Sequence, residues 1–365
     1  MLLPSLSLVL LGAVVGVDAI PQATVTDSLP PADPTSSSSA SVCNNSPDLC
    51  SRPYNQITHL GAHNAAFLRD ESTDHSISGN QYENATFALD AGLRLLQSQV
   101  HNEDGGLRLC HSSCSLHDAG PLEEWLSRIE DWMAANENEV VTILLVNADS
   151  VPASEFATAF ESSGLAARGY VPTSEVAPTS EWLTLETMIS NNQRLVSFIT
   201  NIDRDASAPY LLPEFSYVFE THFDIQSLSG FNCTVDRPSD ATPGTDDGWL
   251  GLVNHFKYDN ILGSFNVPDE ENIETVNSAG TSEGNLGRHL EECREEWGRV
   301  PNFVLVDFWS AADPLAAVDE MNAVSEPEGR GDVAVVPTTG GSGKHMQDLG
   351  RAALLAFVIC AILFN

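Results

Sequence analysis

Val140-Val-Thr-Ile-Leu-Leu-Val-Asn147 is a near-continuous apolar run that ends on a polar side chain. Runs of this kind are typical of parallel strands that are buried on both faces of a sheet. Similar runs recur along the chain and predict further strands at Ile57–Ala62, Leu93–Val100, Leu107–Cys110, Leu195–Thr200, Ser216–Glu220, Leu250–His255 and Phe303–Asp307. Helical patterns separate many of these runs, so we expect strands and helices to alternate.

The clearest helical pattern covers Pro121–Asn136. It opens with a proline and acidic residues, which favour the start of a helix. Its apolar residues recur at helical spacing, as expected for a helix that packs on a core: Leu122, Trp125, Leu126, Ile129, Trp132 and Met133. The alternation extends over residues 43–324, which favours one α/β domain of the βα-barrel type.

The charge of the chain excludes two classes of partner. Its 365 residues include 16 Lys+Arg against 51 Asp+Glu, a formal net charge of −35. Such a chain repels nucleic acid, because Lys and Arg supply most of the affinity for phosphate backbones. It also lacks the polybasic face that would hold it on anionic lipid. With 42% hydrophobic residues, the middle of the chain can still form a substantial core.

The N-terminal residues have the pattern of a secretion signal. An apolar run from Leu2 to Val17 is followed by the small residue Ala19, which predicts a signal peptide over residues 1–19. A buried N-terminal helix is the alternative. Residues 20–42 are rich in Ser, Thr and Pro and predict a linker.

The C-terminal residues have the pattern of a glycosylphosphatidylinositol (GPI) anchor signal. Small residues at 340–343 precede a polar spacer and an apolar tail, Ala352–Phe364, so we expect a linker with the attachment region at 325–343 and a signal tail at 344–365. A short tail-anchor helix is the alternative, although a membrane span needs about 20 residues. We therefore expect a secreted monomer at the cell surface, with the anchor as its only membrane contact.

The cysteines fit an oxidising compartment. Of the seven, Cys360 lies in the predicted tail, and an even number remains: Cys43, Cys50, Cys110, Cys114, Cys233 and Cys293. In a secreted chain such a set indicates three disulfides, in which close spacing favours Cys43–Cys50 and Cys110–Cys114 and leaves Cys233–Cys293, although other pairings stay open. A zinc site is the alternative for the segment 110–114. Glycosylation sequons begin at Asn44, Asn84 and Asn232.

Polar side chains stand at the ends of the predicted strands, where a parallel barrel gathers its active site. These candidates are His63 and Asn64, Gln97 and Gln99, His111, Asn147 and Asp149, Glu220, His255 and Asp307. The two imidazoles of His63 and His111 suit acid/base chemistry near neutral pH, because one can remove a proton while the other donates one. Structural histidines are also common, so spacing alone leaves both interpretations open.

Three stretches carry a resemblance to a known family: Leu60-Gly-Ala-His63-Asn64, Ala91-Gly-Leu-Arg94-Leu-Leu-Gln97-Ser-Gln99 and Leu107-Arg-Leu-Cys-His111. They are similar to the X-domain core of phosphatidylinositol-specific phospholipase C, and more closely to the secreted fungal PLC-like phosphodiesterases. The similarity continues through Val140–Asn147 and Pro301-Asn-Phe-Val-Leu-Val-Asp307-Phe and covers most of residues 50–322.

The resemblance implies a distorted TIM (βα)8 barrel that cleaves a phosphodiester through attack by a hydroxyl of the substrate. It implies that His63 is the general base and His111 the general acid. The substrate and its phosphate would then be bound by Asn64, Gln97, Gln99, Asn147 and Asp307.

This chain departs from the family in how it would neutralise the phosphate charge. The resemblance implies an arginine in the bacterial enzymes and a calcium ion held by acidic residues in the eukaryotic ones. The acidic positions correspond here to Gln97, Gln99 and Asn147, and the bacterial arginine to Gln99. Calcium binds weakly without carboxylates, so these positions do not support a calcium cofactor. Asp149, Glu220 or Asp307 could supply the missing carboxylates. We expect Arg94 to form a structural ion pair.

Three functions follow from these patterns. The leading hypothesis is a phosphoric diester hydrolase of the phospholipase C type, active in lipid metabolism on an inositol phospholipid or a related phosphodiester. A catalytically impaired surface barrel that binds inositol phosphates or glycans is the alternative, motivated by the neutral amides. A diesterase for soluble glycerophosphodiesters is the third.

Overall fold

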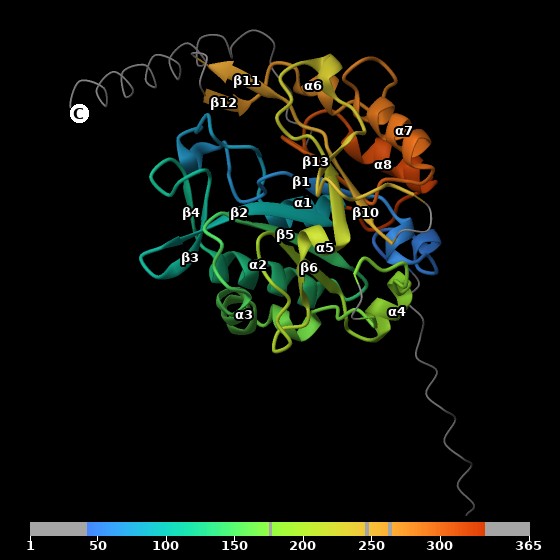
Figure 1. The fold of residues 1–365 in the computed structure, drawn as a ribbon. Helices are drawn as coiled ribbons and strands as arrows, with labels where there is room; N and C mark the ends of the chain where they lie inside the picture. The colour runs from blue at the N-terminus through green and yellow to red at the C-terminus, as the bar shows by residue number, and fades with distance from the viewer. Residues whose placement is uncertain (1–41, 175–176, 245–247, 262–264, 333–365) are drawn as a thin grey trace, which may run out of the picture. The chain divides into compact units, whose positions relative to one another are not determined.

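The computed structural model describes residues 42–174, 177–244, 248–261 and 265–332 (Figure 1). Eight parallel strands form its central sheet: β1 (His59–Ala62), β2 (Leu95–Glu103), β5 (Val141–Asn147), β6 (Leu195–Ile199), β7 (Leu211–Pro213), β8 (Val218–Thr221), β10 (Leu250–Asn254) and β13 (Phe303–Val306). They pair in the order β7-β6-β5-β2-β1-β13-β10-β8. Within the described residues no ladder joins β7 to β8, so the fold is a distorted TIM barrel that is open between these two strands.

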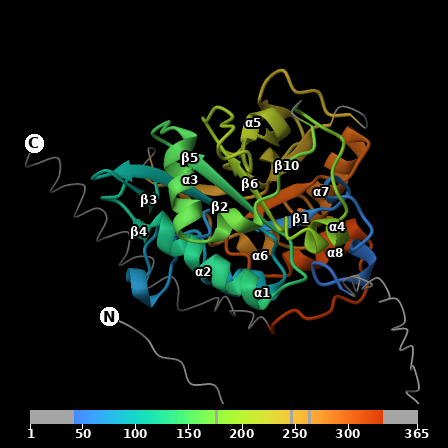
Figure 2. The same ribbon diagram turned by 90° about the horizontal axis from the view of Figure 1, so that it is seen from below.

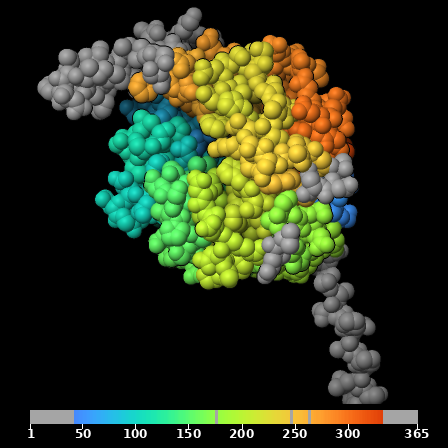
Figure 3. All heavy atoms as spheres, viewed as in Figure 1, coloured from blue at the N-terminus to red at the C-terminus, as the bar shows by residue number. Residues whose placement is uncertain are grey.

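The remaining strands extend the sheet or form a separate hairpin. They are β3 (Gly106–Cys110), β4 (Asp118–Pro121), β9 (Val235–Arg237), β11 (Tyr258–Ile261) and β12 (Phe265–Pro268). In the same view, Figure 3 shows that the yellow and orange parts of the chain, which include β11 and β12, form much of one face of the molecule.

The helices follow the strands along the chain. They are α1 (Ala85–Ala91), α2 (Leu122–Ala135), α3 (Ala153–Ser162), α4 (Leu185–Ser190), α5 (Glu214–Tyr217), α6 (Ile273–Val276), α7 (Leu286–Trp297) and α8 (Pro314–Asn322). Figures 1 and 2 show α1, α2 and α3 on the side of β2 and β5, and α7 and α8 near β1 and β13. None of the helices in the described ranges is long and apolar enough to cross a bilayer.

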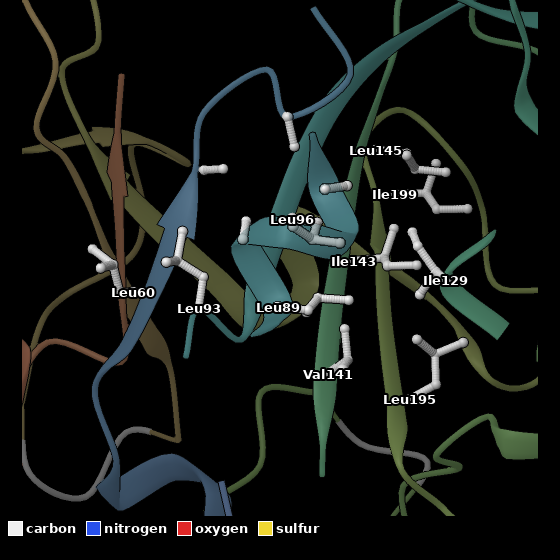
Figure 4. Packing of buried hydrophobic residues seen from close by; sticks show 14 of the residues in the cluster. Leu60, Leu89, Leu93, Leu96, Ile129, Val141, Ile143, Leu145, Leu195 and Ile199 are labelled. Atoms are coloured by element: carbon white, nitrogen blue, oxygen red, sulfur yellow. The ribbon is translucent and has the colours of Figure 1, made fainter. Parts of the chain in front are cut away.

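Alternation along the strands divides the core into two layers. Outward-facing residues pack against α1 and α2, including Leu60, Leu96, Ile143 and Leu145 (Figure 4). Inward-facing residues fill the barrel, including Leu95, Leu144, Val196, Leu252 and Leu305. Because both faces are buried, these strands are apolar throughout, and this explains the continuous runs in the sequence.

Two of the strand predictions were wrong in ways that affect the site. Leu107–Cys110 was expected among the parallel strands, but β3 pairs antiparallel with β2, so the two form a hairpin beyond the barrel. The first residues of the predicted strand 216–220 belong to α5. The barrel strand missed by the sequence patterns is β7, which has only three residues and ends at Pro213.

The described cysteines form three disulfides, Cys43–Cys50, Cys110–Cys114 and Cys233–Cys293. The zinc alternative for segment 110–114 is therefore wrong for this structure. The predicted signal peptide and the anchor signal tail lie outside the described residues.

One predicted glycan acceptor is unsuited to that role. The Asn44 side chain is 6% exposed, and its amide donates to the Val140 carbonyl oxygen at 3.2 Å and accepts from the Val140 N–H at 2.7 Å. A buried amide nitrogen in this position is closed to a glycosyltransferase. Asn84 and Asn232 are both exposed.

Gly61 tests the packing inside the barrel. A Cβ atom at Gly61 would lie 2.7 Å from the Leu95 side chain and 2.8 Å from that of Leu305. We expect Gly61→Ala to lower the free energy of unfolding by about 1–3 kcal/mol through overpacking, as measured by urea titration. Gly106→Ala is the control, since a Cβ there meets only the Glu103 carbonyl oxygen at 3.9 Å. Equal stabilities of the two variants would contradict this account of the core.

Candidate active site

The first and last strands of the barrel bring a histidine and an aspartate together. β1 and β13 pair in parallel with Ala62 opposite Val306, so the next residues, His63 and Asp307, lie in the same layer. His63 Nδ1 is 2.8 Å from Asp307 Oδ1, and the two residues are 6% and 2% exposed. The carboxylate accepts the Nδ1 proton, and this fixes the tautomer in which Nε2 is free to take a proton.

Neighbouring side chains hold this pair in place. Asn80 Nδ2 donates to Asp307 Oδ1 at 2.9 Å, and Gln81 Nε2 donates to the His63 carbonyl oxygen at 2.7 Å. The Phe256 ring stacks on His63 with 3.7 Å between centroids and an interplanar angle of 1°. Asn80 and Gln81 were absent from the sequence predictions, because they lie in a loop without strand periodicity.

Asp307 was predicted to bind substrate or phosphate, but the contact in the structure is with the imidazole. Asn277 Nδ2 donates to the Asp307 carbonyl oxygen at 2.9 Å and fixes its backbone. The second carboxylate oxygen of Asp307 is buried without a hydrogen-bond partner. The residue is therefore placed to orient His63 and to stabilise its protonated form.

The β2–β3 hairpin delivers His111. β3 returns along β2 with Leu109 opposite Val100, so His111 comes back towards the barrel from the far side of the hairpin. The Cys110–Cys114 disulfide and the Phe67 ring, 5.1 Å from the imidazole, confine it. Burial is the main cause that lowers the pKa of His111 to about 3, and His63 and His117 contribute.

Three predicted amides already use their oxygens within the protein. Gln97 Oε1 accepts from the Asn64 N–H at 2.7 Å, and Gln99 Oε1 accepts from the Ser112 N–H at 3.0 Å. The Asn147 side chain points into its own loop, where Oδ1 accepts from the Val151 N–H at 3.0 Å. These residues brace the segments around the site.

Asn64 differs from the other amides. It is fully buried, its backbone has a φ of 51°, and neither side-chain atom has a hydrogen-bond partner. A buried amide without partners is costly, so a ligand atom that bonds to it would gain free energy. Among the predicted amides, Asn64 is therefore a candidate ligand for a phosphate oxygen.

The donor set does not fit calcium. The side-chain oxygens of Gln97, Gln99 and Asn147 accept hydrogen bonds from backbone N–H groups, and none of these three residues is a carboxylate. Asp149, a possible substitute, accepts from the Asn102 N–H at 2.7 Å on the hairpin. Calcium requires several oxygens with negative charge, so we assign no step to this ion.

Three cations that follow barrel strands in the described chain are already paired. Arg69 lies 3.1 Å from Glu270, Arg237 lies 2.6 Å from Glu220, and Lys257 lies 2.5 Å from Asp269. Arg94 binds Glu139 at 2.6 Å and confirms the expected structural ion pair. Positive charge at this end of the barrel is therefore largely compensated.

Glu220 belongs to a second acidic group in the barrel. Asn254 Nδ2 donates to Glu220 Oε2 at 2.9 Å, and Arg237 binds the other oxygen. Burial raises the pKa of Glu220, and burial together with the Glu220 charge raises that of Glu214. Burial therefore favours the protonated form of both carboxyl groups, and Arg237 opposes this. Neither carboxylate is free to replace a calcium ligand.

Taken together, these features define an α/β barrel with a His–Asp pair on one seam and a second histidine on a hairpin. A family model described as PI-PLC X 1 matches residues 49–322. The "PI-PLC X domain-containing protein 1" of Arthroderma benhamiae is 36% identical over 285 residues, covering 78% of this chain and 90% of that protein. The chain belongs to the PI-PLC X family, as its resemblance predicted.

Two further comparisons agree with this assignment. A protein of the same fungus, named "Uncharacterized secreted protein", is 31% identical over 284 residues, covering 77% of this chain and 63% of that protein. A phosphatidylinositol-specific phospholipase C from S. aureus is similar in fold, with a TM-score of 0.50 and 9% identity over 76% of this chain and 95% of that chain. Fold and family support a phosphodiesterase of the phospholipase C type in general.

The low pKa of His111 can be checked directly. We expect its imidazole to titrate near pH 3 in the folded protein by NMR, against about 6.5 in the urea-unfolded chain. Because the unfolded chain binds this proton more tightly, the contribution of His111 lowers stability as the pH falls from about 6.5 towards 3. His111→Gln should therefore lose less stability than the wild type over that interval. Titration of the folded imidazole at the unfolded value would refute its burial.

Proposed function

We propose that the protein is a phospholipase C-like phosphodiesterase that cleaves inositol phospholipids or related phosphodiesters. The observation that carries the proposal is the buried His63–Asp307 pair, in a member of the PI-PLC X family whose second candidate histidine, His111, follows β3. The pair supplies an oriented base, and the second imidazole supplies an acid.

The chemistry is a transfer within the substrate. A hydroxyl group gives its proton to His63 Nε2 while its oxygen forms a bond to phosphorus. The bond from phosphorus to the leaving oxygen breaks, and the proton of His111 passes to the departing alkoxide. The products are a cyclic phosphodiester and an alcohol, and Asp307 stabilises the imidazolium of His63.

The phosphate itself raises the pKa of His111. An anion beside this partly buried imidazole favours the protonated form and opposes the desolvation that lowers its pKa in the free protein. Substrate binding therefore favours protonation of His111, the proposed general acid. Asn64 Nδ2 can donate to a phosphate oxygen, in place of the cation that other enzymes use to stabilise developing charge.

A second candidate function is supported by the paired cations. Arg69, Arg237 and Lys257 are each bound to a carboxylate, and no calcium site is formed by the predicted amides. A barrel with this charge balance could bind inositol phosphates or glycans without turning them over.

Turnover by histidine variants separates these functions. We expect release of a cyclic inositol phosphate from phosphatidylinositol or glycosylinositol phospholipid vesicles, monitored by phosphorus NMR. His63→Ala and His111→Ala should each lower kcat by about 10²–10⁴-fold, because each removes one proton transfer. Turnover should be equal with calcium and with a chelator, since the donor set does not fit the ion.

His75→Asn is the matched control, because His75 is exposed on the loop after β1. Unchanged turnover in either catalytic variant would refute the two-histidine mechanism. Soluble glycerophosphodiesters complete the substrate panel. Absence of any cyclic product from the wild type, together with measurable binding of inositol phosphates, would support the second candidate.

We also propose that the protein is secreted and held at the cell surface by a GPI anchor. The signal sequences at both ends support this, as do the three disulfides and the name of the second fungal relative. Glycosylation is proposed at Asn84 and Asn232, whose side chains are exposed. The Asn84 cap of α1 uses Oδ1, so a glycan on Nδ2 leaves the cap intact.

Truncation tests the anchor. A chain that ends at Gly343 should appear in the culture medium, whereas the full chain should stay on the cell surface, as measured by immunoblotting of both fractions. Ala352→Ser is the control, since it leaves the tail apolar. Equal release of the full and truncated chains would contradict the anchor.

A further inference from the structure

Two buried histidines outside the catalytic group face each other. His255 directly follows β10, and His289 lies in α7; they are 0% and 3% exposed. Their Nδ1 atoms are 2.9 Å apart. His255 Nε2 is 2.9 Å from the Val276 carbonyl oxygen, and His289 Nε2 is 3.1 Å from the Asn232 carbonyl oxygen. The pair thus makes three close polar contacts.

These three contacts require three protons. A carbonyl oxygen only accepts, so the Nε2 atoms of His255 and His289 must both carry hydrogen. A neutral imidazole has one ring proton, and two neutral rings would then face each other with two lone pairs at 2.9 Å. A third proton between the Nδ1 atoms turns that repulsion into a hydrogen bond.

We propose that His255 and His289 bind one shared proton between their Nδ1 atoms, and that this imidazolium–imidazole pair positions the residues that hold the catalytic His63 and Asp307. The inference deepens the proposed function and rests on it for its catalytic consequence. The proton count itself depends only on the contacts of the pair.

The surroundings make the shared proton sensitive to pH. Burial lowers the pKa of both imidazoles, that of His289 to about 4, and the charge of His289 lowers that of His255 further, while the carbonyl hydrogen bonds act in the opposite direction. The Phe231 ring stacks on His255 with 4.1 Å between centroids and favours a cation there. The bridging proton is therefore bound in acid and released as the pH rises.

Few charged groups act on the pair. Glu292 of α7 raises the pKa of His289 and is itself paired with Arg288. The acidic residue of α6 is Glu274, which acts on Tyr82, and beyond β13 Asp307 pairs with His63. The segment before β9 contributes Cys233, which is in a disulfide with Cys293 of α7 and does not titrate.

His255 is linked in two ways to residues that contact the His63–Asp307 pair. Phe256, which stacks on His63, follows His255 in the chain. Asn277, which binds the carbonyl oxygens of Asp307 and Phe308, follows the Val276 that accepts from His255. The Cys233–Cys293 disulfide ties α7 to the segment that contains Asn232. Loss of the bridging proton therefore loosens the support of both catalytic residues.

Nitrogen NMR counts the protons without any activity assay. In ¹⁵N-histidine-labelled full chain we expect three ring N–H groups on the pair in acid: both Nε2–H groups and one strongly deshielded Nδ1–H in slow exchange. The Nδ1–H signal should disappear as the pH rises. Two ring protons at every pH, with one unprotonated Nε2, would overturn the proposal even if the protein proves to be an active phosphodiesterase.

Variants test the positioning role. In His289→Gln the side-chain amide can donate to His255 Nδ1, so no third proton is needed. If the wild-type kcat changes over the same pH range in which the Nδ1–H signal disappears, that change should be absent from the variant. KM should be unchanged. Glu295→Gln, an exposed change on the same helix, should keep the wild-type profile. A wild-type profile in His289→Gln would refute the positioning role, whereas absence of turnover in the wild type would refute the proposed function and leave the proton count standing.

Discussion

The parallel pairing of β1 with β13 is the constraint on which the site depends. These are the first and last strands of the barrel, and their register sets the residues after them side by side. A shift of one residue would turn His63 or Asp307 away from the other, because side chains alternate between the two faces of a strand. Gln81 bonds to the carbonyl oxygens of His63 and Val306, and so fastens both strands at this point. The His63–Asp307 pair is thus a product of the β1–β13 pairing.

Amides take the place of charges around this seam. Gln97, Gln99 and Asn147 secure loops, and Asn80 and Asn277 support Asp307. Neutral groups can brace a buried ion pair without adding a charge that must be desolvated. Among the described residues, the site therefore lacks a cation that would stabilise negative charge on a phosphate, because Arg69, Arg237 and Lys257 are each paired with a carboxylate. The strongly acidic composition therefore describes the surface, while the site is close to neutral.

Much of the barrel could be predicted because burial on both faces leaves a continuous apolar signal, as in Val141–Asn147. His63 could be predicted because it directly follows such a run. β7 has only three residues, too few for a recognisable apolar pattern. β3 could be predicted as a strand from its composition, but nothing in its sequence indicates that it pairs antiparallel with β2. Asn80 and His289 could not be foreseen, because their partners lie 227 and 34 residues away and only the folded chain brings them together.

His111 follows β3, which joins the barrel sheet only through its antiparallel pairing with the end of β2, whereas His63 follows β1 within the barrel. The two candidate histidines therefore depend on different parts of the sheet. A change of length in the segment between β3 and β4 can move His111 without changing the β1–β13 register. The position of the second imidazole can thus vary with one loop, while the pairing of His63 with Asp307 stays tied to the barrel.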